Sequence, residues 1–423
     1  MNPPIKHDQH IIIIGGGIIG LACAHYLSDH DIDILVIDQD GIGSGASHGN
    51  CGLLHFSGVI PLCAPGVISN EIFRMFSSAS PLYIKPGLDF KLYYWLTRFA
   101  LNCNPSHKSH GSAAKTALLK YSLDLFLDLF ALDAFTDKSA CELEKQGLVL
   151  AFKDPKKFEA YKKTNDWLAK YGFGGTAYPN EKLGDLEPCL KPHLAGAWLN
   201  SHDWHLRPDT LMKTWRNHLS QKGVRFLEYA KAQDFLTNEG RIQEVVTPKG
   251  SFKADTFVMA TGAWAGPMAS LLDTRIPVQP GKGYSLTMER PDPCPSIPCL
   301  LYERNMVVTP WESGYRLGGT MEFSGFNSPL DRKRLDRLIE GSQEYLSSPP
   351  GSVVTEEWTG LRPMTSDDLP VIDRSGDYSN LFIATGHGML GITMATGTGK
   401  AITDMILENT LEIDMEAFSA KRF

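Results

Sequence analysis

The sequence predicts an α/β domain joined to an α+β domain with a mostly antiparallel sheet. Three observations lead to this prediction. The apolar strand Ile11–Ile14 runs directly into glycines and then into a helical pattern, which is typical of the start of a parallel, doubly covered sheet. Residues 276–351 read at first as antiparallel strands and close with a charged helix at 330–347. The chain has 423 residues, enough for two separate cores.

The first fifty residues carry a dinucleotide-binding pattern, G-x-G-x-x-G between a strand and a helix. Its first glycine allows a tight turn, its second lets backbone approach a pyrophosphate, and its third lets the helix pack close to the strand. The helix, expected over 18–28, directs its first N–H groups at the phosphates. The next strand ends in an acid, which suits a ribose hydroxyl. The residues expected at the cofactor from this unit are Gly15, Gly17, Ile18, Ile19, Gly20, Asp38 and Gln39.

This fingerprint alone does not separate NAD from FAD, but four later stretches do so by resemblance. The loop "GSGASHGNCGLL" at 43–54 has the Ser-x-x-Asn-x-Gly pattern of amino-acid-oxidase-type flavoproteins. "ATGAW" after a strand at 256–261, "TGLRPMTSDDLPVI" at 359–372 and "NLFIATGHGMLGITMATGTGKAITDMI" at 380–406 are similar to the same superfamily. "APG" at 64–66, the 81–103 segment and "PGKGYSLT" at 280–287 most resemble its bacterial D-amino acid dehydrogenases.

The resemblance implies FAD in a Rossmann-type domain built from separate segments, 1–75, 205–270 and 352–423. Residues 76–204 and 271–351 would form the substrate-binding domain. FAD is expected to be non-covalent, because His48 stands one position away from the attachment histidine of some relatives and no cysteine follows Cys299. The further cofactor residues implied are Ser44, Ser47, His48, Asn50, Cys51, Gly52, Leu53, Ala232, Thr261, Gly262, Trp264, Lys282, Arg362, Gly386, His387, Gly388, Met389, Leu390, Gly391, Ile392 and Thr393.

Arg362 in "GLRP" is the main expected catalytic residue. In the relatives this arginine grips the substrate carboxylate, a role that suits a planar guanidinium. Two departures indicate that the other residues binding the substrate differ from those of the glycine-oxidase-like relatives. Met389 stands where these relatives have a second arginine, and Val307 stands where they have a carboxylate-binding tyrosine. The other catalytic residues expected are Tyr284, Tyr302 and His387.

The family resemblance implies oxidative deamination of an amino acid, most readily a D-amino acid. A hydride passes from Cα to flavin N5, the imine is hydrolysed to a 2-oxo acid, and electrons go to a quinone or another acceptor. The alternatives are oxidation of a secondary amine such as proline, hydroxyproline or sarcosine, NAD-dependent dehydrogenation, and a non-catalytic flavin subunit of a larger complex. D against L preference and oligomeric state, homo- or hetero-, stay open.

Other features of the sequence favour plain structural roles. A net charge of −7 argues against a nucleic-acid partner. Eight scattered cysteines without C-x-x-C indicate free thiols and a cytoplasmic protein, with peripheral contact to the inner membrane left open. His202, Asp203 and His205 lack zinc spacing, so no metal is expected. "ATGTGK" fails the P-loop pattern.

Overall fold

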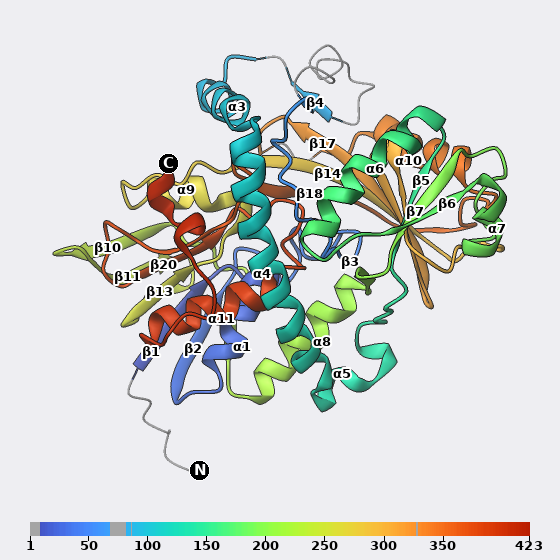
Figure 1. Cartoon of the computed structure of the whole chain (residues 1–423). Coiled ribbons are helices and arrows are strands. Elements are labelled where there is room, and N and C mark those ends of the chain that lie inside the picture. The colour runs from blue at the N-terminus through green and yellow to red at the C-terminus, as the bar shows by residue number, and fades with distance from the viewer. Residues whose placement is uncertain (1–8, 68–81, 86, 327–328) are drawn as a thin grey trace.

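The computed structural model describes residues 9–67, 82–85, 87–326 and 329–423 (Figure 1). Two large sheets dominate it, one built around the N-terminal strands and the other drawn mainly in green and orange. The first eight residues and the start of the 81–103 segment lie outside the described residues. This arrangement confirms the predicted fold class of an α/β unit with an added antiparallel unit.

A six-stranded sheet runs in the order β19-β20-β13-β1-β2-β9. Its neighbouring strands are parallel, except that β19 is antiparallel to β20. Along β1, Ile11 and Ile13 enter one core cluster while Ile12 and Ile14 enter another, so the strand is apolar on both faces. The strands are β1 (Gln9–Ile14), β2 (Ile32–Ile37), β9 (Arg225–Leu227), β13 (Thr256–Met259), β19 (Val371–Arg374) and β20 (Leu381–Thr385).

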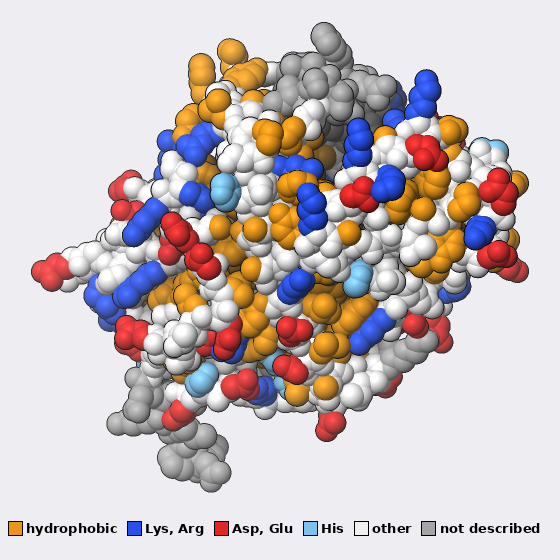
Figure 2. Space-filling view, viewed as in Figure 1, with side chains coloured by type: hydrophobic (Ala, Val, Ile, Leu, Met, Phe, Trp, Pro, Cys, Tyr) orange, Lys and Arg blue, Asp and Glu red, His pale blue; other side chains and the backbone are white. Residues whose placement is uncertain are grey.

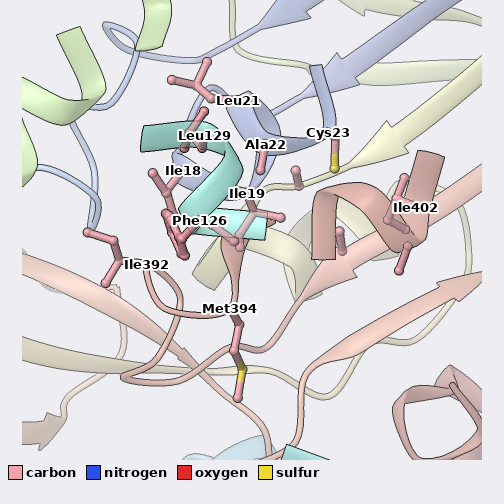
Figure 3. Close-up of a cluster of buried hydrophobic side chains, with 14 of the residues drawn as sticks. Ile18, Ile19, Leu21, Ala22, Cys23, Phe126, Leu129, Ile392, Met394 and Ile402 are labelled. Atoms are coloured by element: carbon pink, nitrogen blue, oxygen red, sulfur yellow. The ribbon is translucent and has the colours of Figure 1, made fainter. Parts of the chain in front are cut away.

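Helices cover one face of this sheet, and their apolar side chains meet in the cluster drawn in Figure 3. α11 lies directly on α1, because a Cβ at Gly399 would lie only 2.5 Å from backbone atoms of Ala22. The glycines of "ATGTGK" therefore serve helix packing. The covering helices are α1 (Ile18–Leu27), α4 (Pro105–Ala131), α8 (Pro208–Gln221) and α11 (Ala395–Ile406). The other face carries α9 (Ala265–Ser270), β10 (Asp234–Asn238), β11 (Arg241–Thr247) and β12 (Gly250–Lys253).

A nine-stranded, mostly antiparallel sheet forms the second half, in the order β18-β14-β17-β16-β15-β5-β7-β6 with β4 beside β17. Side chains of α10 (Arg332–Tyr345), close to the helix expected at 330–347, pack on one face and those of α6 (Pro155–Lys170) on the other. The strands are β4 (Leu82–Ile84), β5 (Leu148–Phe152), β6 (Thr176–Pro179), β7 (Gly196–Asn200), β14 (Gln279–Met288), β15 (Cys299–Leu301), β16 (Met306–Trp311), β17 (Gly314–Phe323) and β18 (Val354–Met364).

The two halves meet along β18. The domain division predicted from the sequence assigns residues 352–423 to the nucleotide domain, whereas β18 pairs with β14 over its whole length in the antiparallel sheet. Further elements are α3 (Phe90–Asn102), α5 (Asp133–Thr136), α7 (Leu183–Leu186), β3 (Leu53–Leu54) and β8 (Trp204–His205). β18 thus brings residues of the second sheet to the edge of the first.

Candidate active site

A cavity with an empty volume of about 1260 Å³ opens at the carboxyl ends of the parallel strands. Its wall includes Ile14 at the end of β1, Ile37 at the end of β2 and Thr385 at the end of β20. Ligands of open α/β sheets bind at this edge. The wall continues to residues 361–363 of β18, so the cavity lies between the two sheets.

The glycine turn after β1 forms the floor of the cavity. Gly15 has φ +110°, which a residue with a side chain rarely adopts, and a Cβ on Gly20 would lie 1.9 Å from the Gly15 carbonyl oxygen. Both positions therefore require glycine. The N–H of Ile18 donates to Ser47 Oγ at 2.9 Å, so the first turn of α1 faces the loop that follows β2. This is the geometry of an anion site at a helix N-terminus.

Asp38 marks one end of the cavity. Its carboxylate accepts hydrogen bonds from the N–H groups of Gly16, at 2.6 Å, and Asp40, at 2.9 Å. Burial raises the pKa of Asp38 above its usual range, and these two bonds oppose that shift. Gln39 and Ala232 line the same end. The arrangement suits a polar, uncharged partner such as a ribose hydroxyl.

The cofactor loop, which we define as residues 43–52, covers the middle of the cavity. Asn50 organises it internally: its side-chain nitrogen donates to the Ser47 carbonyl at 2.9 Å, and its side-chain oxygen accepts from the N–H of Gly52 at 2.8 Å. His48 points out of the loop, and its Nε2 lies 2.6 Å from Glu356 Oε1. The loop therefore presents backbone and small side chains to the cavity.

Arg362 lies in the wall at the other end. The guanidinium donates from Nη1 to the Thr320 carbonyl at 2.9 Å, and among the described residues no carboxylate pairs with it. Burial lowers its pKa, while the nearby Cys51 opposes the shift. Gly283 makes room for the group, since a Cβ there would lie 2.1 Å from Nη1. A half-buried cation in a cavity wall with unused donors is a site for an anionic ligand.

His387 and Thr261 complete this end of the wall. Burial lowers the pKa of His387 to about 3, so its ring is neutral, and Nε2 lies 3.0 Å from Thr398 Oγ1. The hydroxyl of Thr261 is buried and has no hydrogen-bond partner among the described residues. Such an orphaned polar atom in a cavity wall is expected to bond a ligand.

Comparison with known proteins identifies the family. The model of the FAD dependent oxidoreductase family, DAO, matches residues 10–405. The chain belongs to this family. A D-amino acid dehydrogenase of Vibrio atlanticus is 28% identical over 98% of this chain and 100% of the relative, and one of Neisseria gonorrhoeae is 29% identical over 98% and 99%. The crystal structure of glycine oxidase from Geobacillus kaustophilus has a TM-score of 0.76 at 20% identity, covering 98% of this chain and 99% of that one.

The family match therefore confirms the expected family, the expected enzyme class and FAD as the cofactor of this oxidoreductase. Its cavity fits FAD on the chain's own geometry. The Asp38 end suits the adenosine ribose, the α1 N-terminus suits the pyrophosphate, and the orphaned hydroxyl of Thr261 offers a further bond.

The predicted cofactor residues divide into two groups. Those that line the cavity are Gly15, Gly17, Ile18, Ile19, Asp38, Gln39, Ser44, Ser47, Asn50, Ala232, Thr261, Gly262, Trp264, Arg362, His387, Gly388, Met389, Gly391 and Ile392. Those that do not line it are Gly20, His48, Cys51, Gly52, Leu53, Lys282, Gly386, Leu390 and Thr393. Wall residues that sequence reasoning missed include Asp40, Ala46, Lys231, Ala263, Leu361 and Pro363, most of which adjoin a predicted residue.

Three side chains, Lys282 expected near the flavin and Tyr284 and Tyr302 expected at the substrate, lie elsewhere. Lys282 donates to the Pro329 carbonyl at 2.6 Å, and Tyr284 donates to Glu322 at 3.1 Å in the core of the second sheet. Successive residues of a strand face opposite ways, so the same β14 that turns Gly283 to Arg362 turns these two away. Tyr302 packs on Phe152, with ring centroids 4.3 Å apart. These positions correct the expectation that Lys282, Tyr284 and Tyr302 face the cavity.

The histidine–aspartate segment at 202–205 has a structural explanation. The buried Asp203 carboxylate accepts from Ser57 Oγ at 2.7 Å and from the Ser57 N–H at 2.9 Å, and lies 2.9 Å from His55 Nδ1. It thereby fixes the chain that follows β3. Among the described residues, no group of three His, Cys, Asp or Glu side chains is placed to hold a metal ion.

Proposed function

We propose that this protein oxidises an α-amino acid, preferentially a D-amino acid, at its Cα–N bond. The observation that carries the proposal is Arg362, a half-buried guanidinium in the wall of the FAD cavity without a carboxylate partner among the described residues. The near-complete overlap with proteins named D-amino acid dehydrogenase supports the substrate class. The product is an imine, which water hydrolyses to a 2-oxo acid and ammonia.

Bound FAD supplies a two-electron acceptor, and the residues of the chain position the substrate for it. Arg362 would bind the substrate carboxylate through two parallel N–H···O bonds, which fixes the direction of Cα. The Cα–H bond breaks with its electron pair, and the amine loses one proton to solvent as the C=N bond forms. His387, neutral in the wall of the same cavity, would add no second positive charge beside Arg362, so the guanidinium would be the group that binds the carboxylate.

Anaerobic reduction of the flavin tests the proposal. The purified holoprotein is mixed with D- and L-amino acids and with proline, hydroxyproline and sarcosine, and bleaching of the flavin absorbance is followed. We expect D-amino acids to bleach it fastest. Faster reduction by the secondary amines would refute a D-amino acid as the preferred substrate and indicate a secondary amine in its place. No bleaching by any of these compounds would refute amino acid oxidation.

We further propose that the electrons pass to a quinone at a membrane surface through peripheral contact. Among the described residues, no helix is long and apolar enough to cross a bilayer. α3 and the chain just before it, however, project large apolar side chains at the molecular surface: Leu88, which precedes the helix, is 92% exposed, and Phe90 and Leu101 of the helix are 82% and 72% exposed (Figure 2). The exposed Lys91 and Arg275 add positive charge nearby. A surface helix of this kind suits the headgroup region of an anionic membrane.

Vesicle flotation tests the membrane contact. We expect the protein to float with vesicles containing phosphatidylglycerol, and the double variant Leu88→Ser/Phe90→Ser to stay in solution while its rate of flavin reduction is unchanged. Equal flotation of both proteins, or none by the wild type, would refute this contact.

A further inference from the structure

One face of β18 touches both the cofactor loop and the cavity. Glu356, Trp358, Gly360 and Arg362 occupy alternate positions of the strand and so share a face. The Trp358 ring packs on the loop so closely that a Cβ at Gly49 would lie 2.0 Å from it, and a Cβ at Gly360 would lie 1.9 Å from the same ring. The strand that carries the proposed substrate arginine therefore also supports the loop beside FAD.

Arg316, on β17, holds the same loop by its backbone. The residue is only 1% exposed. Nη1 donates to the carbonyl oxygens of His48, at 3.0 Å, and Asn50, at 2.8 Å, while Nε donates to Thr287 Oγ1 at 2.8 Å. Because one nitrogen binds both carbonyl oxygens, the backbone between His48 and Asn50 is held in one conformation. The buried arginine thus sets the backbone of residues 48–50.

Glu356 joins Arg316 to His48 and closes a ring of contacts. Oε2 accepts from Arg316 Nη2 at 3.2 Å, and Oε1 lies 2.6 Å from His48 Nε2. The bond from His48 holds the pKa of the Glu356 carboxyl below its usual value. We call these three residues, His48, Arg316 and Glu356, the loop clamp. The clamp joins β17 and β18 of the second sheet to a loop of the first.

We propose that the loop clamp positions the cofactor loop relative to Arg362 and thereby couples FAD affinity to carboxylate binding. Asn50 transmits the effect, because its backbone carbonyl is held by Arg316 while its side chain bonds Ser47 and Gly52 within the loop and the residue lies in the cavity wall. Since Glu356 and Arg362 share one strand face, a shift of the loop also changes the depth at which FAD lies beside the guanidinium. His48, Arg316 and Glu356 are positioning residues in this scheme. The carboxylate part rests on the proposed function, whereas the FAD part does not.

The next residue of β18 provides a matched control. Glu357 points to the opposite face and pairs with Arg332. The two glutamates are similarly exposed, 33% for the Glu356 side chain and 31% for that of Glu357. Glu356→Gln and Glu357→Gln therefore each remove one charge from adjacent positions of the same strand. A difference between them reports the contact with the loop and not the loss of charge or burial.

The experiment compares wild type, Glu356→Gln, Glu357→Gln and Arg316→Lys. Three quantities are measured: the melting temperature of the apoprotein, the FAD dissociation constant by flavin fluorescence, and the dissociation constant of benzoate, a carboxylate without an oxidisable Cα–H, by flavin difference spectra. We expect Glu356→Gln to weaken FAD by about tenfold, the size of one lost charge-assisted bond, and benzoate severalfold although Arg362 is intact. Arg316→Lys keeps the positive charge but loses the several N–H donors of the planar guanidinium, so we expect it to weaken FAD and benzoate as well.

Glu357→Gln should leave both affinities within about twofold of wild type, since its surface ion pair is worth little. The proposal is overturned if Glu356→Gln and Glu357→Gln behave alike, or if Glu356→Gln lowers the melting temperature of the apoprotein without changing FAD or benzoate affinity. Should Arg316→Lys fail to fold, Glu356→Gln and His48→Gln decide, because both side chains are one-third exposed. Wild-type flavin that no amino acid reduces would refute the proposed function but leave the FAD comparison intact.

Discussion

Arg316 and Arg362 are two arginines of the same sheet, the first fully buried and the second half-buried in the cavity wall, and their surroundings differ sharply. Arg316 is bound by two carbonyls, a hydroxyl and a carboxylate, and it lies 4.8 Å from the Trp311 ring. Arg362 has one bond, to the Thr320 carbonyl, among the described residues. Burial lowers the pKa of both. A buried arginine with its donors used stabilises a structure, whereas a half-buried arginine in a cavity wall with donors unused can bind a ligand.

Arg362→Met gives the largest expected effect on this contrast. Removing one partner of a buried charge pair costs about 2–5 kcal/mol, so we expect kcat/KM for a D-amino acid to fall by roughly 10²–10³-fold. FAD affinity should stay within about twofold, because the methionine removes no contact to the cofactor loop. Steady-state kinetics and a fluorescence titration check the two parts. A large loss of FAD affinity would show that Arg362 holds the cofactor and not the substrate.

Gly283→Ala sharpens the contrast by moving the guanidinium without deleting it. The new methyl group would overlap Nη1, at 2.1 Å. Such overpacking typically costs 1–3 kcal/mol, so we expect KM to rise about tenfold with a smaller change in kcat. Ser285→Ala, two positions along the same strand, is the control and should alter KM little. Unchanged kinetics in Gly283→Ala would mean that the position of Arg362 does not matter.

Acid should destabilise the protein through the cavity histidine. The pKa of His387 is about 3 in the folded protein and 6.5 when unfolded, so the unfolded state binds the proton first as pH falls. Its contribution to stability is complete above pH 6.5 and declines as pH drops toward 3, by about 2 kcal/mol at pH 5. Urea unfolding at pH 7 and pH 5 should show a smaller pH effect in His387→Asn than in wild type. An equal loss of unfolding free energy between pH 7 and pH 5 in both proteins would contradict a neutral, buried His387.

Tyr302→Phe gives the smallest expected effect. The tyrosine ring packs on Phe152 and Tyr161, away from the cavity. Loss of its hydroxyl should therefore change kcat/KM by less than about twofold. A tenfold loss would place this tyrosine at the substrate and restore the expectation drawn from the sequence.

The sequence predicts the nucleotide half well, because its information is local. Strand, glycines, helix and Asp38 are neighbours along the chain, and each needs a particular residue type for a reason that backbone geometry supplies. Arg362 can also be predicted from the sequence, since the motif that contains it is short. The family resemblance supplies its expected role.

The second half is less predictable because its contacts are distant in sequence. The loop clamp joins residues 48, 316 and 356, and no pattern in the sequence links them. On β14 the expected strand is present, but a shift of one position decides which side chains face the cavity, so Lys282 and Tyr284 face the core. Polar residues in such strands acquire their roles only when the sheet is assembled.

The central claim is that Arg362 recognises the substrate carboxylate. Anaerobic flavin reduction by D-alanine and by D-alaninamide, whose carboxylate is replaced by an uncharged amide, tests it most directly in wild type and Arg362→Met. We expect D-alanine to reduce the wild-type flavin much faster than D-alaninamide does, and both compounds to reduce the Arg362→Met flavin slowly and at similar rates. If Arg362→Met keeps the wild-type preference for D-alanine, Arg362 does not recognise the carboxylate.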